Sequence, residues 1–136
     1  MKTAVDTSVL LDVFGADPTF GKRSHDALRD VYDKGALVAC DITWAEVRAH
    51  FPNDTSFEDA MRLIGLQFDP IGLEAARTAG QLWKERRKRG AKRDRIVPDF
   101  LIGAHAQHQA DALLSRDRGF YNSCFKDLST IDPTRL

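Results

Sequence analysis

The stretch AVDTSVLLDV, residues 4–13, decides the fold that we expect for this chain. Apolar residues lead to an acid, Asp6, and a second apolar run begins after Thr7 and Ser8. This order predicts a short strand over about residues 2–5 that passes directly into a helix. A helix needs only one N-cap, and either hydroxyl can provide it, so the pattern leaves the Asp6 carboxylate free at the end of a strand.

The rest of the sequence alternates between helical and strand patterns. Helices are predicted over residues 9–13, about 22–34, 42–51, about 56–66, a long helix from near Leu73, and 97–110, and further strands over 36–40, 112–115 and 128–131. Strands that alternate with helices predict an α/β fold with three layers, α/β/α, around a parallel sheet of about four to five short strands. The length suits one core, so we expect a single domain over residues 1–136.

Composition excludes several classes of protein. The hydrophobic share of 43% and the charged share of 29% are ordinary for a globular chain. No stretch approaches the roughly 18 apolar residues of a membrane span, and an acid stands at position 6, where a signal peptide is apolar. We therefore expect a cytoplasmic protein without a membrane partner. Cys40 and Cys124 belong to no Cys-x-x-Cys motif and are predicted to be buried free thiols.

Three further acids are expected at the same edge of the sheet as Asp6. Glu46 lies one turn into the helix after the strand at 36–40, Asp99 lies in the first turn of a helix, and Asp117 closely follows the strand at 112–115. Parallel sheets bind ligands beyond the carboxyl ends of their strands, so the four carboxylates can meet in one crevice. Each acid alone also has an ordinary explanation, as a cap, a helix-dipole partner, a solvated residue or a turn former.

A cluster of carboxylates has a chemical consequence. Like charges at close range raise one another's pKa, so such a cluster implies that a cation belongs among them. An all-oxygen ligand set suits Mg²⁺ or Mn²⁺ better than zinc. Such an ion acidifies a water for in-line attack on phosphorus, and the same ion or a second one about 4 Å away stabilises the leaving oxygen. The pattern therefore indicates phosphodiester hydrolysis.

Four segments carry a family resemblance. AVDTSVLLD, ITWAEV, VPDFLIGAHA and LLSRDRGFY resemble the acidic motifs of PIN-domain nucleases, and specifically of the VapC-type toxins of toxin–antitoxin pairs. The similarity runs in order from Asp6 to Phe120, with no departure at the acids. Carried over, the resemblance makes four residues metal ligands and catalytic groups: Asp6, Glu46, Asp99 and Asp117. It maps the hydroxyls that orient carboxylates or waters onto Thr7 or Ser8 and onto Ser115.

The resemblance also implies a substrate and partners. Members of the family cut single-stranded or loop RNA with one or two Mg²⁺ or Mn²⁺ ions, which implies an endoribonuclease here. It further implies a homodimer and a VapB-type antitoxin whose C-terminal segment lies across the toxin. A basic side chain pushed toward the acids, such as arginine, would compete with the metal for carboxylate charge.

A basic segment precedes the third acidic motif. Residues 84–95, KERRKRGAKRDR, carry a net charge of +6, although the whole chain is neutral. One interpretation is the solvated end of a helix, and the other is a wall that attracts RNA phosphates, because an acidic crevice alone repels them. The candidate RNA-binding residues are Arg86, Arg87, Arg89, Lys92, Arg93 and Arg95, with Arg116 and Arg118 beside the last acid.

The sequence also suggests three competing interpretations. A phosphatase of the haloacid dehalogenase type needs a second Asp two positions after the first, where this chain has Ser8. His105 and His108 have a spacing that can bind zinc, but no third nitrogen or sulfur ligand matches them. A non-catalytic RNA-binding or interaction module on the same fold remains as the alternative. It would bind RNA without cleaving it, and chelation of Mg²⁺ would not affect binding.

Overall fold

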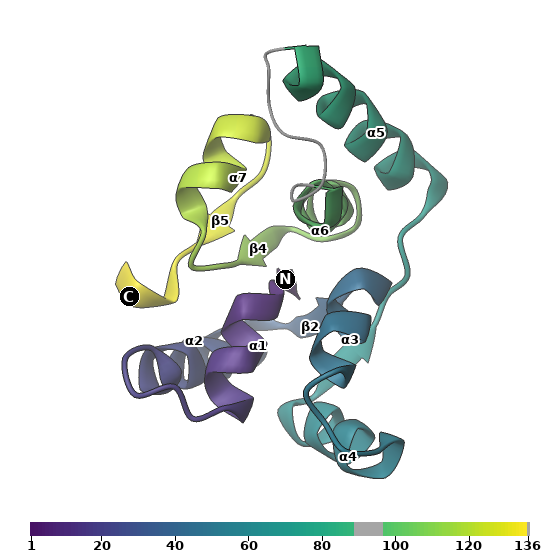
Figure 1. Cartoon of the computed structure of the whole chain (residues 1–136). Coiled ribbons are helices and arrows are strands. Elements are labelled where there is room, and N and C mark those ends of the chain that lie inside the picture. The colour runs from purple at the N-terminus through teal and green to yellow at the C-terminus, as the bar shows by residue number, and fades with distance from the viewer. Residues whose placement is uncertain (89–96, 136) are drawn as a thin grey trace.

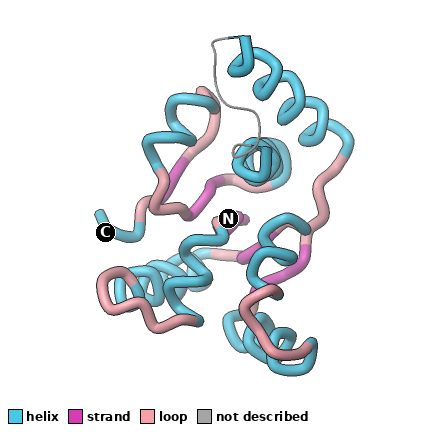
Figure 2. The backbone as a smooth tube through the Cα atoms, viewed as in Figure 1, coloured by secondary structure: helices cyan, strands magenta, loops and turns pink. Residues whose placement is uncertain are grey.

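The computed structural model describes residues 1–88 and 97–135. The strands are β1 (Lys2–Val5), β2 (Ala36–Ala39), β3 (Leu66–Phe68), β4 (Ala112–Leu114) and β5 (Thr130–Ile131). The helices are α1 (Thr7–Phe14), α2 (Gly21–Lys34), α3 (Asp41–Arg48), α4 (Asp54–Ile64), α5 (Leu73–Lys88), α6 (Val97–Gln109), α7 (Arg118–Cys124) and the 3₁₀ helix η1 (Pro133–Arg135). All strand pairs are parallel, in the order β3-β2-β1-β4-β5 (Figure 2).

Two hydrophobic cores cover the two faces of this sheet. Successive strand residues point to opposite faces, so Ala4 packs in one core with Phe100 of α6, while Val5 packs in the other with Leu10 of α1 and Leu28 of α2. Figure 1 shows α5, α6 and α7 on one side of the sheet and α1, α2 and α4 on the other. The three-layer α/β/α architecture with a parallel sheet is therefore confirmed.

The direction of winding reverses at β1. The chain proceeds from β1 to β2 and β3 on one side, whereas β4 and β5 lie on the other side of β1. The backbone N–H of Asp6 donates to the carbonyl of Leu114 at 2.9 Å, which extends the pairing of β1 with β4 by one residue. Asp6 and the residues after Leu114 thus lie at a topological switch point, where open α/β sheets place their ligands.

The clearest differences from the sequence predictions concern strand β3 and helix α7. The helix expected over about 56–66 is α4, which ends at Ile64, and Leu66 instead begins strand β3. Gly65 separates them in the left-handed conformation, with φ 79°, which favours glycine and ends a helix. The short helix α7 after Asp117 was also not predicted.

Both cysteines lie in the described part of the chain and are free, as predicted. Cys40 is buried, but Cys124 is only half-buried, so the prediction of burial was wrong for the second thiol. In residues 1–88 and 97–135, no helix combines the length and apolar character that crossing a membrane requires.

Candidate active site

Asp6 is the buried centre of the acidic site. Its Oδ1 accepts a hydrogen bond from the backbone N–H of Thr7 at 2.8 Å, and its Oδ2 accepts one from Ser115 Oγ at 2.7 Å. The N-cap of α1 is therefore Asp6 itself, the ordinary explanation given for this acid, and neither the Thr7 nor the Ser8 hydroxyl takes that role. One carboxylate fixes the start of α1 and joins it to the end of β4.

Thr7 connects α1 to α3. Its hydroxyl lies 2.8 Å from Glu46 Oε1 and 3.2 Å from Thr43 Oγ1. Sequence reasoning missed Thr43, although it lies three residues before Glu46 and so on the same face of α3. Of the two candidate hydroxyls, Thr7 is the one that holds an acid, because Ser8 Oγ is buried without a hydrogen-bond partner among the described residues.

Ser115 links two of the acids directly. Besides donating to Asp6, its Oγ accepts a hydrogen bond from the backbone N–H of Asp117 at 2.9 Å. Ser115 is fully buried, whereas Asp117 is exposed at the start of α7. Ser115 Oγ thus connects the backbone of Asp117 to the carboxylate of Asp6.

The four candidate carboxyls lie within electrostatic range of one another. Burial raises the pKa of Asp99 to about 6, and the charges of Asp6, Asp117 and Glu46 add to this rise. Burial also raises the pKa of Asp6, opposed by its hydrogen bonds from Ser115 and Thr7, with Asp117 and Glu46 raising it further. The structure therefore brings together carboxyls that the sequence separates by up to 111 positions, from Asp6 to Asp117.

Tyr121 of α7 is a further buried polar residue within range of the acids' charges. It is completely buried, and among residues 1–88 and 97–135 its hydroxyl has no hydrogen-bond partner. Burial raises the pKa of this phenol, and the charges of Asp6, Asp99 and Asp117 raise it further, so the hydroxyl stays protonated. Sequence reasoning missed this residue, because nothing in the sequence predicted α7.

The donor set fits a hard divalent cation. All four side chains offer oxygen, and two of them, Asp6 and Asp99, have carboxyl pKa values that a nearby positive charge would lower. Within the described residues, no three His, Cys, Asp or Glu side chains form a ready-made ligand set. Mg²⁺ commonly binds through one or two carboxylates, several waters and substrate phosphate, so such a closed set is not needed.

The histidines of α6 have other partners. An imidazole nitrogen of His105 lies 2.9 Å from Asp69 Oδ2, and one of His108 lies 2.7 Å from Thr78 Oγ1. Each ring thus joins α6 to a different neighbouring segment, which accounts for both without zinc.

The candidate RNA-binding arginines differ in their surroundings. Arg86 is half-buried, with Nη1 3.1 Å from Cys124 Sγ and its guanidinium over the ring of Phe120, so it packs α5 against α7. Arg87 is exposed and stacks on Trp83, and Arg118 is exposed at the start of α7. Arg89, Lys92, Arg93 and Arg95 lie outside the described residues.

Arg116 is bound within the protein. Its Nε donates to Asp12 Oδ2 at 2.7 Å, and its Nη2 donates to Asp12 Oδ1 at 3.1 Å. Because the Nε and Nη2 edge of its guanidinium already binds Asp12, we do not include Arg116 among the phosphate-binding residues that we propose. Sequence reasoning missed Asp12, which faces inward from α1 and is almost fully buried.

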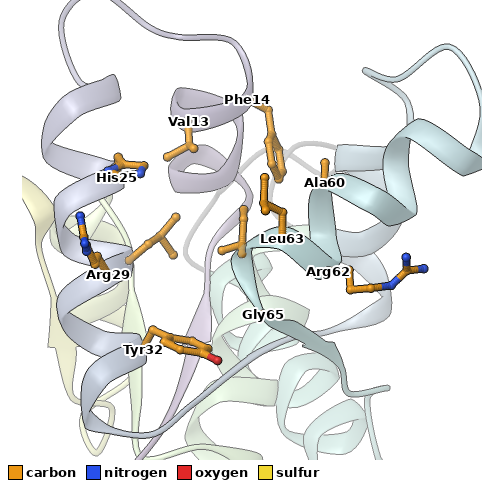
Figure 3. A pocket seen from close by; sticks show the side chains of 11 residues that line it. Val13, Phe14, His25, Arg29, Tyr32, Ala60, Arg62, Leu63 and Gly65 are labelled. Atoms are coloured by element: carbon orange, nitrogen blue, oxygen red, sulfur yellow. The ribbon is translucent and has the colours of Figure 1, made fainter.

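A separate pocket of about 510 Å³ lies between α1, α2 and α4 (Figure 3). Its lining is largely apolar, with Val13 from α1, Tyr32 from α2, and Leu63 and Ile64 from α4. None of the four acids lines it. Leu63 is 90% exposed, so the edge of this pocket presents apolar surface away from the four acids.

The protein is an α/β domain whose parallel sheet has several carboxyl groups near its topological switch point. The chain matches the PIN domain family over residues 3–126 and belongs to that family. The resemblance inferred from the four acidic motifs is therefore confirmed. No curated protein matches the chain by sequence.

Solved structures share this fold across nearly the whole chain. A chain of VapBC2 from Rickettsia felis, solved bound to a promoter DNA fragment, matches with a TM-score of 0.74 at 15% identity, over 97% of this chain and 98% of that one. FitAcB from Neisseria gonorrhoeae matches with a TM-score of 0.70 at 20% identity, over 98% and 99%. VapC20 from Mycobacterium tuberculosis, a toxin that cleaves the sarcin-ricin loop, matches with a TM-score of 0.56 at 13% identity, over 93% and 98%.

Proposed function

We propose that this protein is a Mg²⁺- or Mn²⁺-dependent endoribonuclease and the toxin component of a VapBC-type toxin–antitoxin system. The observation that carries the proposal is the group of four carboxyls at the switch point of the sheet, two of them with raised pKa values. Such a group destabilises the fold at neutral pH unless a cation neutralises it. Membership of the PIN family and the shared fold with VapC20 support RNA as the substrate.

Different residues of the chain have different roles at this site. Asp6, Asp99, Asp117 and Glu46 would hold one or two ions, and Ser115 and Thr7 orient the carboxylates of Asp6 and Glu46. When bound, a divalent ion supplies the charge that activates water and stabilises the leaving oxygen of the phosphodiester. The hydrogen bonds of Asp6 keep its carboxylate aligned before the ion and the RNA arrive.

Basic side chains must offset the repulsion between these acids and RNA. We propose that Arg87 and Arg118, both exposed, serve this purpose together with Arg89, Lys92, Arg93 and Arg95. Phosphate contacts release counterions, so each lost contact lowers the slope of log K against log salt by about one. The double replacement Arg87→Ala/Arg118→Ala should therefore weaken RNA binding at low salt and flatten this slope by about two. An unchanged slope would refute the assignment.

The activity is tested by incubating the protein with total RNA, with Mn²⁺ and with a chelator. The wild type should cleave RNA only with Mn²⁺, and Asp6→Asn should be inactive while remaining folded, because Asn Oδ1 can still accept from Thr7 N. Asp30→Asn, an exposed carboxylate on α2, is the matched control and should cleave normally. Equal cleavage by wild type and Asp6→Asn would reject the acidic site. RNA binding without any cleavage would instead identify a non-catalytic binding module.

The proposed partner is a VapB-type antitoxin, as in the VapBC complexes that share this fold. We assign an apolar anchor of that antitoxin to the pocket between α1, α2 and α4, where Leu63 exposes its side chain. Leu63→Asp should weaken antitoxin binding at least tenfold without changing RNA cleavage by the free toxin. Unchanged affinity for the antitoxin would show that it does not dock at this pocket. We further propose that the protein is a homodimer and acts in the cytoplasm.

A further inference from the structure

A partly buried ion pair lies directly beside the acidic site. Arg116 stands between Ser115, which donates to Asp6, and Asp117. Its guanidinium makes a bidentate contact with Asp12, at 2.7 Å and 3.1 Å. The Asp12 side chain is 5% exposed and that of Arg116 is 28% exposed. Planar, two-point contacts of this kind fix orientation as well as charge.

The pair is supported on its remaining sides. Ser24 Oγ of α2 donates to Asp12 Oδ2 at 2.8 Å, and the Arg116 guanidinium lies over the ring of Phe20, 4.1 Å from its centroid. The backbone carbonyl of Asp12 accepts from the N–H of Asp17 at 2.9 Å. Asp12 therefore joins α1, the start of α2 and the turn after β4.

Two contacts, Asp6 with Ser115 and Asp12 with Arg116, connect α1 and its N-cap to the β4–α7 turn. Asp6 begins α1 and binds Ser115, and Asp12 lies further along the same helix and binds Arg116. Two side-chain contacts thus fasten consecutive residues of the β4–α7 turn to one rigid helix. If the Asp12 contact were lost, the hydrogen bond from Ser115 to Asp6 would be the one side-chain contact left between this turn and the start of α1 in the described part of the chain.

We propose that Asp12 and Arg116 form a clamp that positions Ser115 and Asp117 for metal binding and catalysis. Both are positioning residues, because they act through the turn and contact neither the ion nor RNA. The clamp rests on the proposed metal-dependent nuclease function. A buried ion pair is weak evidence for stability, and we assign to this one the role of fixing a single arrangement of the turn.

The clamp predicts a specific pattern in kinetics. Changes that act through metal-site support commonly cost 10- to 100-fold in metal affinity or activity. Arg116→Ala should therefore lower kcat about 10- to 100-fold and weaken Mn²⁺ binding, measured by electron paramagnetic resonance, about tenfold. KM for RNA and its salt dependence should stay within twofold. A phosphate-binding arginine would do the reverse, raising KM and flattening the salt slope with kcat unchanged.

Further variants separate positioning from simple support of the fold. Arg116→Lys keeps the charge but loses the fork, so it should lose Mn²⁺ affinity even if Arg116→Ala fails to fold. In a double-mutant cycle, Asp12→Ala/Arg116→Ala should lower kcat no further than the worse single variant. Arg77→Ala, which breaks an exposed pair with Glu74 on α5, is the matched control and should match the wild type.

Amide hydrogen exchange of the metal-free protein adds a readout that needs no activity. The N–H of Asp117 donates to Ser115 Oγ, so it should exchange faster in Arg116→Lys than in the wild type, while the amides of β1 remain unchanged. If the wild type cleaves RNA and Arg116→Lys matches it in kcat, Mn²⁺ affinity and Asp117 exchange, the clamp is refuted and the nuclease proposal stands. If the wild type neither binds Mn²⁺ nor cleaves RNA, both proposals fall.

Discussion

Replacing Asp99 by asparagine should make the metal-free protein more stable at neutral pH while it lowers nuclease activity. The reason is the raised pKa of this carboxyl, about 6 against an ordinary 3.8, caused by burial and by the charges of Asp6, Asp117 and Glu46. The folded protein disfavours the ionised form of Asp99. At a pH between these two pKa values, Asp99 therefore keeps its proton in the folded protein but has lost it in the unfolded chain. Stability of the metal-free wild type therefore falls as pH rises from about 4 to about 6.

The magnitude follows from the same pKa. Each pKa unit corresponds to about 1.4 kcal/mol, so the rise to about 6 sets an upper limit of about 3 kcal/mol. Asp99 is partly exposed, and solvent screening reduces this to roughly 1–2 kcal/mol. The variant also loses a charge that favours the N-terminus of α6, which costs about 0.3–1 kcal/mol. We expect a net gain of about 1 kcal/mol, or roughly 3–5 °C in Tm.

Urea denaturation followed by circular dichroism measures this gain. Wild type and Asp99→Asn should be equally stable at pH 4, and the variant should become the more stable protein by pH 7. Saturating Mn²⁺ should reverse the order, because the ion stabilises only the chain that retains its ligand. The exposed Asp30→Asn serves as the control. A stability difference between Asp99→Asn and wild type that does not vary with pH would refute the reasoning.

Three other substitutions test particular contacts. Ser115→Ala removes the hydroxyl that orients Asp6, so kcat should fall about 10- to 100-fold with little change in KM, measured by steady-state RNA cleavage. Gly103→Ala would place its Cβ 2.4 Å from Cε2 of Phe125, so urea denaturation should reveal a loss of about 1–3 kcal/mol. Gly80→Ala, whose Cβ would meet no described atom within 4 Å, should instead stabilise α5 by about 0.5–1 kcal/mol.

The sequence was sufficient to predict the sheet's acidic edge. An apolar run that ends at or just before an acid is a local pattern, and it occurs at Asp6 and again close to Asp117. Parallel pairing then brings such positions together without knowledge of any side-chain contact. Strand β3 was missed because only Leu66 of its three residues is buried, so it lacks the apolar run of the other strands, although Gly65 was a usable signal for the end of the preceding helix.

The contacts that support the acids could not be predicted from local sequence patterns. Asp12 and Arg116 are 104 positions apart, and neither sequence neighbourhood indicates that they pair. Arg116 was expected to bind RNA because it flanks Asp117, and only the fold shows that its Nε and Nη2 bind Asp12. Thr43 and Tyr121 likewise gain their significance from which elements pack around them, which depends on long-range packing.

The most direct test of the proposed metal site is an anomalous difference map from crystals grown with Mn²⁺. A manganese peak should lie within coordination distance of carboxylate oxygens from Asp6 and at least one of Glu46, Asp99 and Asp117, and it should vanish in Asp6→Asn. A peak elsewhere on the molecule, or none at saturating Mn²⁺, would contradict the account.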